Sequence, residues 1–362
     1  MIIQDIQVGS ISLPLARPFK TALRTVDRVE DVVVRVVADN GAVGYGEAPP
    51  TAVITGDTIG SITCAIRDFI RPALLGRDVE DLEGNMAALS RCILKNTSAK
   101  AAVDMALYDL WAKRWNAPLY RLLGGARSTF QTDITISVNP VDEMVADSLD
   151  AVSKGFSILK IKVGKEGLAD VERIAAIRAA VGPDVALRVD ANQGWTAKDS
   201  VAIISALEDK GLNIDLVEQP VSAHDIDGMV YVTERVQTPI LADESVFSPA
   251  DALELIRRHG ADLINIKLMK TGGIHEALKL CGVAQLSGVE CMIGCMLESK
   301  LAVSAAAHLC CGKGIITRAD LDGPSLCAID PFVGGPVFDG PTVSMTDAPG
   351  IGITSVPCEH WS

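Results

Sequence analysis

The chain has 362 residues, of which 33 are basic and 46 acidic, so its formal net charge is −13. Hydrophobic residues make up 48% and charged residues 22%, a composition typical of a folded globular protein rather than a disordered one. The acidic balance argues against a nucleic-acid partner, because phosphate binding needs a basic surface. No apolar stretch reaches the roughly 20 residues that span a bilayer, so we expect no membrane partner.

The first residues alternate like a strand and lack a basic segment, which argues against a secretory signal. We therefore expect a cytoplasmic protein. Its nine cysteines are then expected to be reduced thiols that act as small buried hydrophobes.

The first 125 residues predict a unit of strands followed by helices. Residues 2–13 alternate between apolar and polar, and residues 32–37 are a β-branched run, both typical of strands. Residues 41–50 are expected to form a loop, because their glycines lack the spacing of a dinucleotide-binding turn. Residues 98–115 carry apolar side chains at helical spacing along one face.

From residue 130 onward, short apolar runs alternate with helix-like stretches such as 168–182, 197–211 and 249–260. The runs are 133–139, 158–164, 185–193, 214–220, 239–245, 263–270, 289–299 and 316–324. Alternation of this kind predicts a parallel sheet, and eight units predict a closed barrel of the (β/α)₈ type. An open doubly wound sheet is the alternative, but no phosphate-binding glycine turn follows the first strand.

Charged side chains recur where these runs end. They are Lys160, Lys162, Asp190, Glu218, Asp243, Lys267, Glu298, Asp320 and Asp322. Successive positions from Lys162 to Lys267 are 24 to 28 residues apart, which fits one strand and one helix per step. We therefore expect these charges at the same height, on the C-terminal rim where barrel enzymes carry out catalysis.

Asp190, Glu218 and Asp243 are expected to form a carboxylate cluster on this rim. Burying three carboxylates together is costly unless a cation joins them. Ligands that are all oxygen favour magnesium or manganese over zinc. The sequence therefore predicts a divalent cation at this place.

Lys160 and Lys162 are two residues apart on a strand, so both should point to the same face. Each ammonium is expected to lower the pKa of the other toward the range of a general base. Lys267 lies four strands further round the barrel. Lysines on the two sides could then act on one substrate carbon. One would remove a proton from one face of the carbon, and the other would deliver a proton to the opposite face.

Several motifs resemble those of the enolase superfamily, in its muconate-lactonizing subgroup. They are KIKVG (160–164), RVDANQGW (188–195), VEQP (217–220), ADES (242–245) and NIKLMKTGGI (265–274). The resemblance covers essentially the whole chain and implies an α/β fold, a (β/α)₇β modified TIM barrel with an N-terminal α+β capping domain. The cap would be residues 1–125, completed by about 325–362, and the barrel would be residues 126–324.

The resemblance also implies roles for the residues on the rim. Asp190, Glu218 and Asp243 would bind one Mg²⁺ per subunit. Lys162 would act on the L-configured substrate and Lys267 on the D-configured one. Family members are usually homo-oligomers.

The last strand narrows the substrate class. Asp320 and Asp322 should face the same way and could hold a substrate ammonium group. This pair resembles the dipeptide epimerases, as does MLES (296–299). Two cap loops, residues 18–25 and 51–58, resemble those of the L-Ala-D/L-Glu epimerases. Further substrate contacts are then expected from Arg24 on a γ-carboxylate, and from Thr135, Lys160 and Glu298.

The activity implied is the magnesium-dependent interconversion of L-Ala-L-Glu and L-Ala-D-Glu by 1,1-proton transfer at the Glu Cα, through an enediolate. A role in recycling murein peptides would follow. Three enzyme alternatives stay open: epimerisation of other L-Ala-Xaa dipeptides, racemisation of N-acylamino acids, and o-succinylbenzoate synthesis. The last two should not need Asp320 and Asp322. A non-catalytic barrel is disfavoured, because every expected metal ligand and lysine is present.

Overall fold

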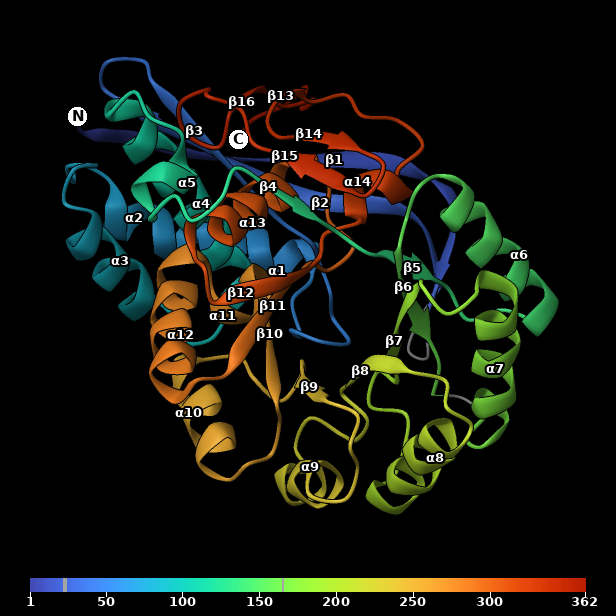
Figure 1. Ribbon diagram of the computed structural model, residues 1–362. Helices are drawn as coiled ribbons and strands as arrows, with labels where there is room; N and C mark the ends of the chain where they lie inside the picture. Colours follow the sequence, from blue (N-terminus) through green and yellow to red (C-terminus); the bar gives the residue numbers. More distant parts are fainter. Residues whose placement is uncertain (22–24, 165) are drawn as a thin grey trace.

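The computed structural model describes residues 1–21, 25–164 and 166–362 (Figure 1). At its centre eight parallel strands follow one another around a barrel in chain order. They are β5 (Ile134–Ile136), β6 (Ile158–Lys162), β7 (Ala186–Asp190), β8 (Ile214–Glu218), β9 (Ile240–Ala242), β10 (Leu263–Lys267), β11 (Glu290–Gly294) and β12 (Ile316–Asp320). All eight predicted strands are confirmed. Each is shorter than its apolar run, because the end of the run continues into a loop or, after β10, into a short helix.

Helices follow the first seven of these strands and cover the outside of the barrel (Figure 1). They are α6 (Val141–Ser153), α7 (Ala169–Val181), α8 (Ala197–Asp209), α9 (Ile226–Thr233), α10 (Pro249–Arg257), the short α11 (Leu268–Thr271) with α12 (Ile274–Ser287), and α13 (Lys300–Gly312). Seven strand–helix units and a final strand make a (β/α)₇β barrel. The predicted fold class is therefore confirmed.

The N-terminal part is a second layer of strands and helices. The strands β1 (Ile3–Lys20), β2 (Thr25–Ala38) and β3 (Val43–Ala48) pair antiparallel. The helices are α1 (Ile59–Cys64), a π-helical turn (Ala65–Ile70), α2 (Arg71–Leu74), α3 (Leu82–Arg91), α4 (Thr97–Arg114) and α5 (Leu119–Leu122). The helix α4 is buried on all sides rather than along one face, because it lies between the barrel and β3.

The expectation of a loop at residues 41–50 was wrong, because this segment contains β3. Its glycines serve close packing rather than a turn. A Cβ at Gly44 would lie 2.0 Å from the Ala106 carbonyl oxygen, and one at Gly46 would lie 1.9 Å from that of Ala102. Only glycine lets this strand approach the backbone of α4 so closely.

The C-terminal residues run back over the barrel toward the first strands. They form α14 (Gly323–Leu326), β13 (Val333–Gly334), β14 (Val337–Asp339), β15 (Thr342–Ser344) and β16 (Ile353–Ser355). The strand β15 pairs with β14 and with β4 (Thr129–Gln131). The backbone of Ser362 makes two 2.9 Å hydrogen bonds with Val8 of β1. The domain boundaries given above stay a prediction.

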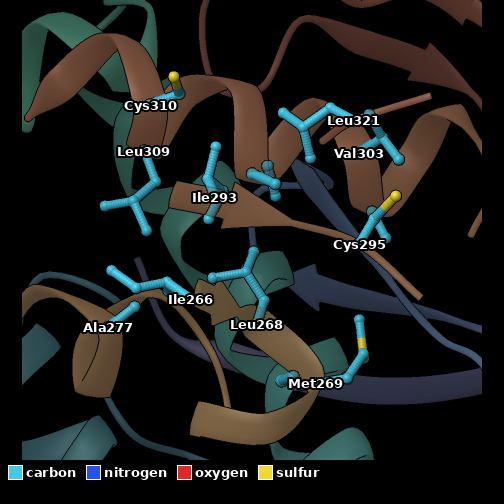
Figure 2. Close-up of a cluster of buried hydrophobic side chains, with 14 of the residues drawn as sticks. Ile266, Leu268, Met269, Ala277, Ile293, Cys295, Val303, Leu309, Cys310 and Leu321 are labelled. Carbon is cyan, nitrogen blue, oxygen red and sulfur yellow. The ribbon is translucent and has the colours of Figure 1, made fainter. Parts of the chain in front are cut away.

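The main apolar core lies between the barrel strands and their helices. Figure 2 shows the part where Ile266 of β10 and Ile293 of β11 pack with Leu309 of α13, all fully buried. All nine cysteines are free, and those on the barrel are buried, whereas Cys64 is exposed, contrary to expectation. No helix in the described part of the chain is long and apolar enough to cross a membrane.

His308 of α13 gives the core a dependence on pH. Its Nδ1 accepts a 2.9 Å hydrogen bond from the Tyr120 N–H, and burial lowers its pKa from 6.5 to about 3. Because the folded-state pKa is lowered, the contribution of the neutral ring is complete above pH 6.5 and is lost as the pH falls toward 3. We expect His308 to account for a loss of about 2 kcal/mol in the free energy of unfolding between pH 6.5 and 5.

The variant His308→Asn keeps an acceptor near the Nδ1 position but does not titrate. Urea denaturation at pH 7 and at pH 5 should therefore show a smaller loss of stability in this variant than in the wild type. Equal losses in the two proteins would contradict the assignment.

Candidate active site

A pocket of about 630 Å³, including its open mouth, lies at the carboxyl ends of the barrel strands. Polar side chains from six strand ends line it: Thr135, Lys160, Lys162, Asn192, Asp243, Glu244, Lys267, Asp320 and Asp322. Apolar and small side chains close the rest: Phe19, Thr21, Thr51, Val53, Ile54, Cys295, Met296, Leu297 and Leu326. The first five of these belong to the cap segments that the sequence singled out. The pocket is therefore shared between the barrel rim and the cap.

Two lysines face the pocket from opposite sides of the barrel. Lys162 ends β6 and Lys267 ends β10, and three strands separate these two in the sheet order. Both side chains are buried, with about one-fifteenth of each residue exposed. The predicted placement of the two amines across one pocket is thus observed.

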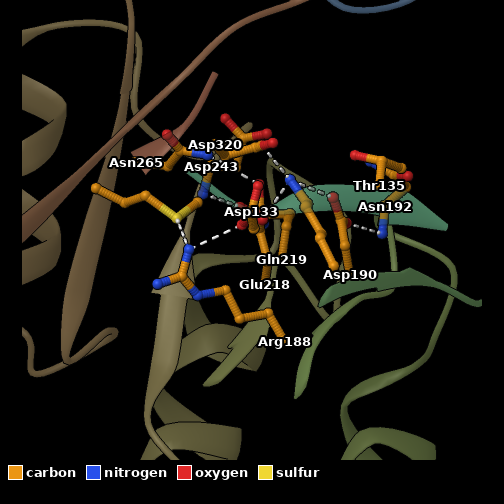
Figure 3. Close-up of polar contacts among 12 residues, drawn as sticks. Asp133, Thr135, Arg188, Asp190, Asn192, Glu218, Gln219, Asp243, Asn265 and Asp320 are labelled. Atoms are coloured by element: carbon orange, nitrogen blue, oxygen red, sulfur yellow. Dashed lines mark hydrogen bonds and ion pairs between the residues drawn. The ribbon is translucent and has the colours of Figure 1, made fainter. Parts of the chain in front are cut away.

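Carboxylates surround the lysine ammonium groups. Lys160 Nζ lies 2.6 Å from Asp320 Oδ2, 2.7 Å from Glu218 Oε2 and 3.0 Å from Asp190 Oδ2. Lys162 Nζ lies 2.5 Å from Asp190 Oδ2. Figure 3 shows Asp190, Glu218 and Asp320 converging on this cluster. Every member is buried, so these contacts are poorly screened by water.

The expectation of a lowered lysine pKa is wrong for Lys160. Burial alone would lower the pKa of Lys160, but Asp320, Glu218 and Asp190 raise it well above its ordinary value. Burial likewise disfavours the charged form of Lys267, but Asp243, 2.6 Å away, raises the pKa. The spacing of the lysines along a strand predicts that they repel each other. It does not reveal which carboxylates from distant strands attract them.

The three carboxylates of the predicted metal site differ in their acidity. Burial, with the charge of Asp190 added, raises the pKa of Glu218 to about 7. Burial also opposes ionisation of Asp190 and Asp243, but Lys162 and Lys267 respectively hold their pKa values below the ordinary range. The site is thus short of positive charge at Glu218, where the nearest ammonium is shared with two other carboxylates.

In the described part of the chain, no three His, Cys, Asp or Glu side chains are arranged to hold a metal ion, and each carboxylate contacts a lysine instead. Several buried oxygen atoms at the ends of β7 to β10 nevertheless have no hydrogen-bond donor: Asn192 Oδ1, Glu218 Oε2, Asp243 Oδ1, Glu244 Oε2 and Asn265 Oδ1. Glu218 Oε2 and Asp243 Oδ1 have ionic contacts that lack hydrogen-bond geometry. Such a surplus of hard oxygen acceptors fits a magnesium ion.

Two residues that the sequence reasoning missed hold Asp243 in place. Gln219 Oε1 accepts hydrogen bonds from the N–H groups of Asp243 and Ser245, at 2.9 and 3.1 Å. Lys270 is fully buried, donates to the Asp243 carbonyl and lies 2.6 Å from Asp243 Oδ1. Gln219 lies in the motif VEQP and Lys270 in NIKLMK. Strand spacing alone does not show that these two side chains are buried rather than exposed.

Asp320 and Asp322 lie on the side of the pocket formed by β12 and β5. Asp322 Oδ2 accepts a 2.7 Å hydrogen bond from the Thr135 N–H, and burial raises its pKa to about 6. Burial opposes ionisation of Asp320 as well, but Lys160 lowers its pKa to about 2. The two carboxylates thus line the same pocket, as the sequence predicted, and Thr135 lies beside Asp322.

Glu298 and Arg24 are the remaining residues that the sequence predicted for this site. The Glu298 carboxylate accepts a hydrogen bond from the Met296 N–H at 2.8 Å and does not line the pocket. Arg24 lies outside the described residues.

Comparisons with known proteins agree with this geometry. Residues 4–124 match the N-terminal domain of mandelate racemase and muconate lactonizing enzymes, and residues 143–357 match the enolase C-terminal domain-like family. The chain is 53% identical to the L-Ala-D/L-Glu epimerase of Clostridium acetobutylicum over 98% of its length and 99% of that protein.

Two solved structures are also very similar. The first is a substrate-liganded complex of the L-Ala-D/L-Glu epimerase from Bacillus subtilis, with a TM-score of 0.96, 51% identity and coverage of 98% of this chain and 99% of that one. The second is a dipeptide epimerase from Enterococcus faecalis complexed with Mg and L-Leu-L-Tyr, with a TM-score of 0.95, 42% identity and coverage of 98% and 100%. The family expected from the sequence is confirmed: the chain belongs to the enolase superfamily, with the two domains of the mandelate racemase and muconate lactonizing enzymes.

Proposed function

We propose that the protein is an isomerase that interconverts L-Ala-L-Glu and L-Ala-D-Glu by moving the proton at the Glu Cα. The observation that carries this proposal is the pair of lysines, Lys162 and Lys267, which line one pocket from opposite sides of the barrel. Inversion at a carbon needs a base on one face and an acid on the other. The close relatives named above support the choice of substrate.

In this proposal Lys162 removes the proton from the L-configured Glu residue and Lys267 delivers one to the opposite face. In the reverse direction the two lysines exchange roles. Asp320 and Asp322 hold the ammonium group of the alanine residue at the other end of the dipeptide. Lys160 sits between them and the carboxylate cluster, where it balances negative charge.

Asp190, Glu218 and Asp243 would hold one Mg²⁺ per subunit. When bound, the ion would stabilise the negative charge that develops on the substrate carboxylate, and its charge would lower the pKa of the nearby lysines. Glu218 is suited to this role, because its Oε2 atom is buried and has no hydrogen-bond donor.

A second candidate is an epimerase of hydrophobic dipeptides. The described part of the pocket wall includes Phe19, Ile54, Met296, Leu297 and Leu326, all apolar. The relative from Enterococcus faecalis is complexed with L-Leu-L-Tyr. Arg24, in the cap segment that follows Phe19 and Thr21, would decide between an acidic and an apolar second residue.

A panel of L-Ala-L-Xaa dipeptides tests this choice. We expect kcat/KM for L-Ala-L-Glu to exceed that for L-Ala-L-Leu at least about tenfold, since a γ-carboxylate paired with a guanidinium is worth more than 1.4 kcal/mol. Polarimetry or chiral chromatography gives the rates. The variant Arg24→Met should reverse the order, whereas Arg17→Met, at an exposed residue of β1 that pairs with Asp147, should not.

Faster turnover of L-Ala-L-Leu by the wild type would establish the second candidate instead. A role in recycling murein peptides, location in the cytoplasm and assembly into homo-oligomers remain predictions that rest on the family resemblance.

A further inference from the structure

The last strand of the barrel, β12, meets the first, β5, at a seam that few backbone hydrogen bonds hold together. Among the described residues no strand ladder joins β12 to β5. One backbone hydrogen bond crosses this seam, from the Asp133 N–H to the Ala319 carbonyl at 3.3 Å. Arg188 reinforces it from inside the barrel, where Nη1 donates to the Ala319 carbonyl at 3.1 Å. The same atom donates to Asp133 Oδ2 at 2.8 Å (Figure 3).

Elsewhere along this seam, side-chain oxygens accept hydrogen bonds from backbone N–H groups. The Leu321 N–H donates to Thr132 Oγ1 at 2.8 Å. Three residues after Thr132 and one residue after Leu321, the Thr135 N–H donates to Asp322 Oδ2 at 2.7 Å. These bonds involve Asp322 itself and Leu321, the residue between Asp320 and Asp322. The two carboxylates that line the pocket therefore lie at the seam.

Thr132 is well placed to fix the position of Leu321. Its side chain is buried, with 1% of the residue exposed. Its own N–H donates to the Pro341 carbonyl at 2.8 Å, so the backbone that carries the hydroxyl group is itself anchored. Leu321 is fully buried, and without Thr132 its N–H would have to shift to find another acceptor.

A shift of Leu321 would change the spacing of the carboxylates on either side of it. Asp320 is held from the neighbouring strand, where the Cys295 N–H donates to its carbonyl at 3.2 Å. Asp322 is held by Thr135. The bond to Thr132 ties the middle of the pair to the segment that leads into β5.

We propose that Thr132, which does not line the pocket, is a positioning residue that sets the Asp320–Asp322 pair for the substrate's ammonium group through its hydrogen bond to Leu321. The inference rests on the proposed function, because it concerns a dipeptide with a free amino terminus. It predicts an effect on substrate affinity rather than on proton transfer, since neither catalytic lysine belongs to the seam.

The test uses Thr132→Val, which keeps the shape and removes the acceptor, and Thr132→Ser, which restores it. For L-Ala-L-Glu we expect KM to rise about tenfold in the valine variant, with kcat within about threefold of the wild type. The serine variant should return KM to within about twofold. Hydrogen exchange followed by mass spectrometry should show faster exchange of the Leu321 amide in the valine variant only.

Thr238→Val is a matched control for loss of stability. Thr238 is also buried, and its hydroxyl donates to Glu208 Oε1 at 2.8 Å, away from the pocket. This variant should lose stability without a change in KM. If Thr132→Val does not fold, Thr132→Cys, whose sulfur is a weak acceptor, should raise KM by a smaller factor.

A KM within twofold of the wild type in Thr132→Val, or a rise that Thr132→Ser does not reverse, would overturn the inference and leave the proposed function intact. If the wild type acts on no dipeptide, the proposed function fails and the positioning role falls with it. Exchange at Leu321 would then report on the seam alone.

Discussion

Replacing Lys267 by alanine should abolish conversion of L-Ala-L-Glu to its epimer while exchange of the Glu α-proton with solvent continues. Lys162 can still remove the proton from the L-configured substrate and return a deuteron to the same face. Without Lys267 no group can deliver one to the other face, and epimerisation should fall by at least about 1,000-fold. Proton NMR in D₂O separates the two events, because loss of the α-proton signal reports exchange and new diastereomer signals report inversion.

The mirror-image variant provides the second half of this experiment. Lys162→Ala should lose exchange from L-Ala-L-Glu and keep exchange from L-Ala-D-Glu. Lys267→Arg keeps a cation beside Asp243 but cannot act as a base near neutral pH, so it should resemble the alanine variant. Lys279→Ala, on the outer helix α12, is the control and should behave like the wild type. Wild-type rates of epimerisation in either active-site variant would contradict the mechanism.

Glu218→Gln should greatly weaken binding of magnesium while the protein stays folded. The change removes one negative charge and one of the buried oxygens that lack a hydrogen-bond donor, at nearly constant shape. We expect affinity for Mg²⁺ to fall at least about 100-fold. Isothermal titration calorimetry with Mg²⁺, or electron paramagnetic resonance with Mn²⁺, measures this directly. Dialysis of the wild type against EDTA should abolish epimerisation, and added Mg²⁺ should restore it.

Asp215→Asn is the control for this variant. Asp215 lies on the same strand as Glu218 but at the opposite end, where it pairs with Arg188 at 3.0 Å. Its replacement should leave affinity for Mg²⁺ unchanged. Equal affinity in Glu218→Gln and the wild type would show that the carboxylate cluster does not bind the ion.

The barrel and its rim could be predicted because they obey a simple period. Each strand and helix together take 24 to 28 residues, so Lys162, Asp190, Glu218, Asp243 and Lys267 fall on successive strand ends. Strand alternation likewise brings Asp320 and Asp322 to one side. Both patterns depend on the geometry of a single strand or of one strand–helix unit, so they are visible in the sequence.

Features that depend on contacts between distant segments were missed. Gly44 and Gly46 look like turn residues in the sequence, yet they serve the approach of β3 to α4, about 60 residues away. The pKa of Lys160 depends on Asp320, which lies 160 residues further along the chain and reaches it across the seam of the barrel. The spacing of residues along the sequence predicts neither of these two contacts.

The central claim is that two amines face one substrate carbon from opposite sides. A crystal structure with Mg²⁺ and L-Ala-L-Glu tests it most directly. The proposal predicts Lys162 Nζ and Lys267 Nζ about 3 to 3.5 Å from the Glu Cα on opposite faces, with the ion on Asp190, Glu218 and Asp243. Both amines on the same face of that carbon, or an ion held elsewhere, would contradict it.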